Sequence, residues 1–121
     1  MSVCDPPHPA WDLLLELSIS VREQDGTDPF IGRRLPGLFR QEGLTGIGAE
    51  AAADIYPPGH SRRTIRMDLV RSMRPKILER KLADERELEE LDRAAREHLG
   101  DPDTLVLPHL LFLVWGRKPL A

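Results

Sequence analysis

The sequence has little cysteine, few aromatic residues and no long apolar run, and each scarcity excludes a class of protein. Cys4 is the single cysteine among 121 residues, so no internal disulfide can form and nothing indicates an oxidising compartment. Aromatic residues make up 5%, which leaves few rings for stacking nucleic-acid bases. The longest apolar run, Leu110 to Trp115, is far shorter than the ~20 residues of a membrane-spanning helix. The net charge of −3 gives no overall positive field that would attract nucleic acid.

Apolar residues make up 40% of the chain and charged residues 31%, a balance typical of one globular domain that does not associate with membranes. Residues 1–10 contain several prolines and are expected to be irregular. They have neither the basic nor the apolar segment of a secretory signal. The sequence therefore predicts a cytoplasmic protein whose folded region covers residues 11–121.

Apolar residues at helical spacing predict four or five helices. The expected ranges are 11–21, 31–42, 61–72, 77–82 and 84–99. Pro75 separates the third range from the fourth, because proline interrupts a helix. Asp84 and Glu87 have the spacing of a capping box, and Gly43 stands where a helix ends in a left-handed residue.

Two segments favour strands. Alternating apolar residues from Ile47 to Ile55 have the period of a half-buried strand, and Tyr56 follows at its end. The continuous apolar run over residues 110–116 is typical of a strand buried on both faces, and Pro108 excludes an earlier regular start. Together with the helices, these strands predict an α+β fold with a small antiparallel sheet or hairpin.

Charge is unevenly distributed between two neighbouring stretches. Residues 60–82 carry eight Arg or Lys and two acidic residues, whereas residues 84–103 carry nine acidic residues and three Arg. We expect the two stretches to pair with each other, although an exposed pair adds only ~0 to 1 kcal/mol. The alternative is that the basic stretch binds nucleic acid or phosphate.

Two motifs occur in a characteristic order: GRRLPGLFRQEGL over residues 32–44 and LFLVWGRKP over residues 111–119. Together they resemble the C-terminal part of class I S-adenosylmethionine-dependent methyltransferases, and the similarity spans roughly residues 11–119. In that family a helix like the first motif leads into the sixth strand of a Rossmann-like sheet. The seventh strand, which lies antiparallel between two others, ends like the second motif. The resemblance implies that residues 33–42 form a helix covering one sheet face, with Leu35, Leu38 and Phe39 inward.

The part of the family fold that binds the cofactor is not found in this sequence. That part uses a glycine-rich turn between a strand and a helix. Here Gly46 and Gly48 are the only closely spaced glycines, and they open a strand instead of following one. We therefore expect a truncated, methyltransferase-like chain that does not bind S-adenosylmethionine alone and acts with a separate cofactor-binding chain. No histidine and acidic residues have the spacing of a metal site.

In similar enzymes, the insertion between the sixth and seventh strands covers a small-molecule methyl acceptor. Here that insertion is the helical region 60–100. By this analogy, four residues are candidates to line the acceptor pocket: Tyr56, His60, Arg63 and Met67. His60 is the candidate general base. The alternative is that His60 is solvated near a helix start and that Tyr56 anchors a strand end. His109 could face the cleft, or it could be hydrogen-bonded where the last strand begins.

Two further functions compete with the methyltransferase hypothesis. The first is a non-enzymatic interaction module that forms a homodimer, because two strands alone are marginal in water and gain from pairing across copies. The second and weaker one is a small nucleic-acid-binding regulator that uses the basic stretch from Ser61 to Arg74.

Overall fold

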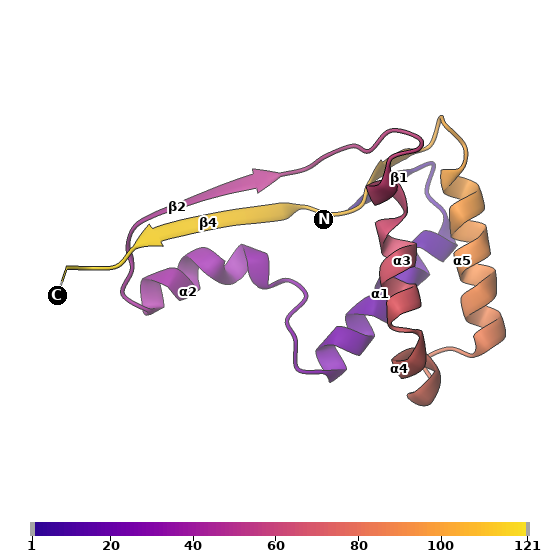
Figure 1. Cartoon of the computed structure of the whole chain (residues 1–121), viewed down its shortest axis with the longest axis horizontal. Helices are drawn as coiled ribbons and strands as arrows, with labels where there is room; N and C mark the ends of the chain where they lie inside the picture. Colours follow the sequence, from indigo (N-terminus) through magenta and orange to yellow (C-terminus); the bar gives the residue numbers. More distant parts are fainter. Residues whose placement is uncertain (1, 121) are drawn as a thin grey trace.

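The computed structural model describes residues 2–120 and places a two-stranded ribbon beside a helical body (Figure 1). The α-helices are α1 (Pro9–Gln24), α2 (Leu35–Gln41), α3 (Ile65–Ser72), α4 (Arg74–Glu79) and α5 (Glu85–Leu99). The strands are β1 (Val3–Asp5), β2 (Thr45–Ala52), β3 (Leu105–Leu107) and β4 (Leu111–Arg117), and two 3-10 turns are η1 (Ile31–Arg34) and η2 (Ser61–Thr64). The predicted α+β class, with four or five helices and a small antiparallel sheet or hairpin, is confirmed for the described part of the chain, which has five α-helices and two two-stranded antiparallel sheets.

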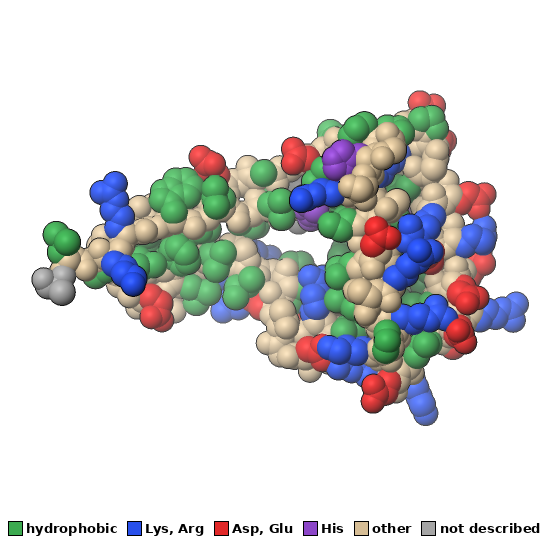
Figure 2. Space-filling model, viewed as in Figure 1, with side chains coloured by type: hydrophobic (Ala, Val, Ile, Leu, Met, Phe, Trp, Pro, Cys, Tyr) green, Lys and Arg blue, Asp and Glu red, His purple; other side chains and the backbone are tan. Residues whose placement is uncertain are grey.

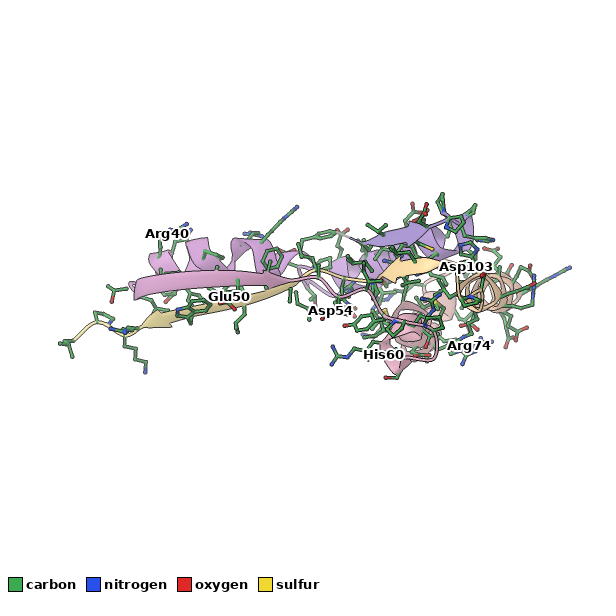
Figure 3. The ribbon with its side chains drawn as sticks, turned by 90° about the horizontal axis from the view of Figure 1, so that it is seen from above. Arg40, Glu50, Asp54, His60, Arg74 and Asp103 are labelled. Atoms are coloured by element: carbon green, nitrogen blue, oxygen red, sulfur yellow. The ribbon has the colours of Figure 1, made fainter. Side chains whose placement is uncertain are left out.

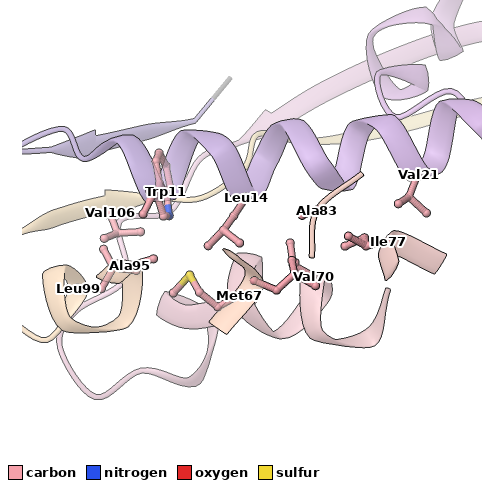
Figure 4. Close-up of a cluster of buried hydrophobic side chains, with 12 residues drawn as sticks. Trp11, Leu14, Val21, Met67, Val70, Ile77, Ala83, Ala95, Leu99 and Val106 are labelled. Carbon is pink, nitrogen blue, oxygen red and sulfur yellow. The ribbon is translucent and has the colours of Figure 1, made fainter. Parts of the chain in front are cut away.

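The helical body consists of α1, α3, α4 and α5 together with β1 and β3. Its core lies where α1 packs against α3 and α5 (Figure 4). Leu14 of α1, Met67 of α3 and Ile77 of α4 are fully buried there, and Ala95 and Val106 close the core from α5 and β3. Full burial of a side chain such as Leu14, Met67 or Ile77 contributes roughly 1.5–3 kcal/mol, so these residues join the helices into one body.

Local signals in the sequence determine where the helices begin and end. Pro36 occupies the first turn of α2 and Pro75 the first turn of α4, where the missing amide hydrogen costs no helical bond. The Asp84 carboxylate accepts a hydrogen bond from the Glu87 amide at 2.8 Å and so caps α5. Gly43 follows α2 with a φ of +81°, as expected for a left-handed helix end.

A second, very small sheet lies in the helical body. β1 pairs antiparallel with β3, and Cys4 is opposite Val106. Residues 1–10 are therefore not irregular throughout: the prediction was wrong for Val3–Asp5, and α1 already begins at Pro9. The backbone groups of Val3–Asp5 gain partners from a strand about 100 residues away, which local sequence cannot indicate.

The ribbon is formed by β2 and β4, which pair antiparallel with Ala49 opposite Val114 and Ala51 opposite Phe112. Helix α2 covers one face of this ribbon, as Figure 3 shows from above. On that face Gly116 leaves room for Phe39 of α2, because a Cβ at Gly116 would meet the Phe39 ring at 3.4 Å. The predicted inward position of Phe39 is confirmed.

The outer face of the ribbon, opposite α2, is uncovered within residues 2–120. It carries Leu113 and Trp115, whose exposed fractions are 62% and 45%. Their cross-strand partners are small or charged, such as Gly48 beneath Trp115 and Glu50 opposite Leu113. The expectation that this strand is buried on both faces is therefore wrong for the chain as described, because no element of it packs on the outer face.

The oppositely charged stretches pair between neighbouring helices, as predicted. Arg71 of α3 contacts Asp92 of α5 at 2.7 Å, and Arg96 of α5 contacts Asp68 of α3 at 2.8 Å. Arg74, Lys76 and Arg80 also pair with carboxylates, and Arg63 and Arg66 are buried. Among the described residues, Arg62 and Lys81 are the two cations of the basic stretch that form no salt bridge and are not buried. No helix in the described range is long and apolar enough to cross a membrane.

Candidate functional site

Three of the five predicted site residues lie together where the ribbon joins the helical body. The Tyr56 ring is buried, with the His60 ring at 4.7 Å and the His109 ring at 6.2 Å from it, measured between centroids. Tyr56 also donates its backbone amide to the Val106 carbonyl at 3.2 Å. Tyr56 is therefore an anchor at the end of the connection from β2, and the two imidazoles pack on its ring.

His60 serves the backbone in this arrangement. Its Nδ1 accepts a hydrogen bond from the Arg62 amide at 3.0 Å, and thereby caps η2. The side chain is exposed and does not line the cleft described below. Its position matches the alternative of a solvated histidine near a helix start.

Arg63 is not available to a substrate. It is 4% exposed, and its guanidinium donates to four backbone carbonyls, those of Tyr56, Leu99, Asp101 and Thr104, at 2.9, 3.0, 3.1 and 2.6 Å. Two of these carbonyls belong to the last turn of α5 and the turn after it, where helical backbone acceptors lack internal partners. The assignment of Arg63 to an acceptor pocket is corrected: it joins the two ends of the helical insertion.

Met67 is also misplaced by the sequence prediction. It is 0% exposed and belongs to the core cluster between α1, α3 and α5. A side chain with no exposed surface cannot line a pocket that a ligand enters. The apolar stripe of α3 faces the core through Met67 and Val70, whereas Leu69 lies on the side of the cleft.

A cleft of about 790 Å³ separates the ribbon from the helical body. Figure 2 shows it as an opening between the two parts. Its walls come from α1, η1, α3 and the start of β4, and His109 is one of the residues lining it. The volume lies within the ~300–1,000 Å³ that is usual for small-molecule sites.

The ribbon makes a close contact with η1 beside this cleft. The Phe112 ring of β4 lies on the backbone of Gly32 in η1, so that a Cβ at Gly32 would come within 2.6 Å of the ring. Phe30 lies beside this contact, with the Arg33 guanidinium 5.2 Å from its ring centroid. The cleft therefore has an aromatic rim formed by segments about 80 residues apart in the sequence.

Arg66 forms a polar part of the wall. Its guanidinium lies 3.4 Å from the Trp11 ring centroid and donates to the Trp11 carbonyl at 3.1 Å and to the Ser2 hydroxyl at 2.8 Å. Burial lowers its pKa to about 10, which still leaves it charged at neutral pH. Arg66 thus places a fixed positive charge behind the cleft.

His109 meets the cleft with one ring nitrogen unsatisfied. Its Nε2 is buried and has no hydrogen-bond partner within residues 2–120. Burial lowers the pKa of His109, and the charges of Arg62 and Arg66 act in the same direction, opposed by Asp54. The imidazole is thus favoured in its neutral form, and a polar ligand atom could complete its hydrogen bonding.

The lowered pKa of His109 predicts a stability that falls on acidification. The unfolded chain takes up the proton near pH ~6.5 while the folded chain resists it, so the unfolded state binds more protons below that pH. We expect the free energy of unfolding to decrease between pH 7.5 and 5.5 by more in the parent than in His109→Gln, measured by urea unfolding. Equal pH dependence of the parent and His109→Gln would contradict the prediction.

Most of the residues that form the cleft have no sequence pattern that marks them as site residues. Arg33 belongs to the first recognised motif, which was assigned to covering the sheet, and Phe30 lies two residues before that motif. Arg22 gave no signal beyond its place at the end of an amphipathic helix. The described residues contain no cluster of three or more potential metal ligands.

Comparisons with known proteins add no family assignment. No model of a protein family matches the chain. No curated protein matches it either.

Proposed function

We propose that this chain forms the C-terminal part of a class I S-adenosylmethionine-dependent methyltransferase, with its cofactor-binding half lying outside these 121 residues. In this proposal β2 and β4 are the sixth and seventh strands of a Rossmann-like sheet, and α2 is the helix that precedes them. The helical insertion between them would cover a small-molecule acceptor, and S-adenosylmethionine would be bound by the other half.

The observation that carries the proposal is the incomplete burial of the ribbon. Its outer face exposes Leu113 and Trp115, and β4 pairs with β2 alone among the described strands. Two-stranded ribbons are marginal in water, and an unpaired edge invites a further strand. A strand as apolar as β4 is typical of the interior of a sheet that is covered on both faces. A larger sheet that continues from β4 would pair its free edge, and helices packed on that sheet would cover the outer face.

The test is reconstitution with the polypeptide encoded immediately upstream, which should contain a glycine-rich strand-to-helix turn. We expect the chain alone not to bind S-adenosylmethionine at sub-millimolar concentration in calorimetry, and the mixture to bind it. Association should shift the emission of Trp115 to the blue, because that ring is 45% exposed while Trp11 is already buried. Binding of the cofactor by the chain alone, or an upstream sequence without the turn, would contradict the proposal.

A matched pair of variants locates the contact. Leu113→Lys adds a charge on the outer face yet can pair with Glu50 across the strands, so the ribbon is retained while association is lost. Leu105→Lys places the same charge on an exposed leucine of β3 and should associate like the parent. Equal association of the two variants would show that the outer face is not the interface.

The exposed outer face also favours the alternative hypothesis of a homodimer. Two copies could bury Leu113 and Trp115 against each other and pair their β4 edges. Sedimentation of the chain alone separates the two functions: a monomer at micromolar concentration disfavours the dimer, whereas a dimer dissociated by Leu113→Lys favours it.

A further inference from the structure

The ionisable residues that line the cleft between the ribbon and the helical body are all basic. Its lining includes Arg22, Arg33, Arg66 and His109, and no aspartate or glutamate. This is notable in a chain whose net charge is −3. Apolar walls of low polarisability strengthen the field of the arginines inside such a cleft, so an anion is favoured there over a neutral or cationic ligand.

Two of these arginines have donors to spare. Arg33 is exposed and lies over the Phe30 ring, and Arg22 is held by the Ser18 carbonyl and hydroxyl, both at 3.2 Å. Neither forms a salt bridge in the described part of the chain, whereas the neighbouring Arg34 pairs with Asp28 at 2.7 Å. A guanidinium has five donors, and it holds a carboxylate through two parallel hydrogen bonds.

Nearby carboxylates do not fill the cleft. Asp28, which lies near enough to interact with the charge of Arg33, already accepts from the Arg34 side chain and from the Phe30 amide at 2.9 Å, and it does not line the cleft. Asp12 acts on Arg66 and Asp54 on His109, and both lie outside the lining of the cleft. The positive charge of Arg22 and Arg33 is therefore not neutralised from within the walls.

The remaining walls are apolar. Phe30 and Phe112 form the rim, and the sides are completed by Leu15, Ile19, Ile65, Leu69 and Leu111. Ligands of this size are usually held by such surfaces, and a few polar groups fix their orientation. The wall chemistry thus favours a ligand with an apolar body and a single anionic group.

We propose that the cleft binds a small apolar carboxylic acid, with its carboxylate on Arg22 and Arg33 and its apolar body against Phe30 and Phe112. The neutral Nε2 of His109 is then available to a second polar atom of the ligand. That this ligand is the methyl acceptor rests on the proposed function. The binding of such a ligand in the cleft does not.

The test compares three probes of one shape on the full chain without S-adenosylmethionine: naphthalene-2-carboxylate, its neutral carboxamide and cationic 2-naphthylmethylamine. We expect calorimetry to give about tenfold or tighter binding of the carboxylate than of the carboxamide, since a charge-assisted pair adds at least that much. Decanoate, tested in parallel, distinguishes an acyl from an aromatic body. The His109 ring protons should shift on binding in nuclear magnetic resonance spectra.

Substitutions test whether Arg22 and Arg33 bind the carboxylate. Arg33→Gln should weaken carboxylate binding, and Arg33→Gln combined with Arg22→Gln should reduce it to the affinity of the carboxamide, whose own binding should stay unchanged. The matched control is Arg40→Gln on α2, an exposed arginine outside the cleft that is labelled in Figure 3. Because Arg33 is exposed, its single variant should fold, which circular dichroism verifies.

The outcomes separate this inference from the proposed function. Equal affinity for carboxylate and carboxamide, or equal effects of Arg33→Gln and Arg40→Gln, overturns the anion site while reconstitution with a cofactor-binding half can still succeed. Selective carboxylate binding that depends on Arg33 supports the site even where reconstitution fails, and then only its role as a methyl acceptor is lost.

Discussion

Replacing Arg63 by alanine should lower the free energy of unfolding by about 3 to 5 kcal/mol, because a hydrogen bond to a charged donor is worth roughly 1.5–3 kcal/mol and several are lost together. Three of the four hydrogen bonds that Arg63 donates are buried and the fourth is partly buried, so most of these carbonyls would lose their partner without gaining contact with solvent. Such a loss is a large part of the ~5–15 kcal/mol that stabilises a domain. Urea unfolding followed by circular dichroism gives the difference.

Arg62 provides the matched control because it is the adjacent arginine of η2 and is exposed. Arg62→Ala should change the stability by less than about 0.5 kcal/mol, as is usual for surface substitutions. Should Arg63→Ala fail to fold, Arg63→Lys keeps the measurement possible, since one ammonium with three donors can replace only part of the four contacts. Equal stability of the Arg62→Ala and Arg63→Ala proteins would show that the clamp does not stabilise the insertion.

Met67→Ala should cost about 2–5 kcal/mol, the range found when a large buried side chain is truncated and a cavity remains. Met67 is 0% exposed between α1, α3 and α5, so its neighbours can close the space only by moving helices. Leu69, two residues further along α3, is 37% exposed and provides the control. We expect Leu69→Ala to cost about 1 kcal/mol or less, because folding removes less of the apolar surface of Leu69 from water than of Met67.

Thermal and urea unfolding of both variants decide between two positions for Met67. A core residue destabilises the protein when it is truncated, whereas a residue in the wall of an open pocket leaves stability nearly unchanged. Equal losses for Met67→Ala and Leu69→Ala would therefore contradict the packing described for α3.

The parts of the fold that sequence predicted are those with local causes. Pro75 separates α3 from α4 because a proline ring excludes the helical bond at its own position, wherever the helix lies in the molecule. Asp84 and Gly43 likewise act on backbone groups within a few residues of themselves. The ends of the helices could therefore be predicted without knowledge of the tertiary structure.

The role of Arg63 could not be predicted in this way. Three of its four acceptors lie 36, 38 and 41 residues further along the chain, and no local pattern identifies them. An arginine that holds carbonyls and an arginine that binds a ligand have the same place in a basic stretch. The same limit applies to the cleft, because Arg22 and Phe112 come together only after α1 and β4 have packed.

The outer face of the ribbon could not be predicted from the sequence for a different reason. The apolar residues of β4 correctly predicted a strand, but composition indicates only that such side chains avoid water. It does not indicate which polypeptide covers Leu113 and Trp115. Burial within the chain was therefore the wrong expectation, although the secondary structure was right.

The positions of the two chain ends have a practical consequence for protein production. Ser2 lines the cleft and accepts a hydrogen bond from Arg66, whereas the carboxyl end of the chain follows β4 at the far end of the ribbon (Figure 1). An affinity tag fused ahead of Ser2 would begin at the wall of the cleft and would compete with an added compound for the cleft. A tag that follows Leu120 on a flexible spacer keeps the entrance open, so purification handles for ligand titrations belong at the carboxyl end.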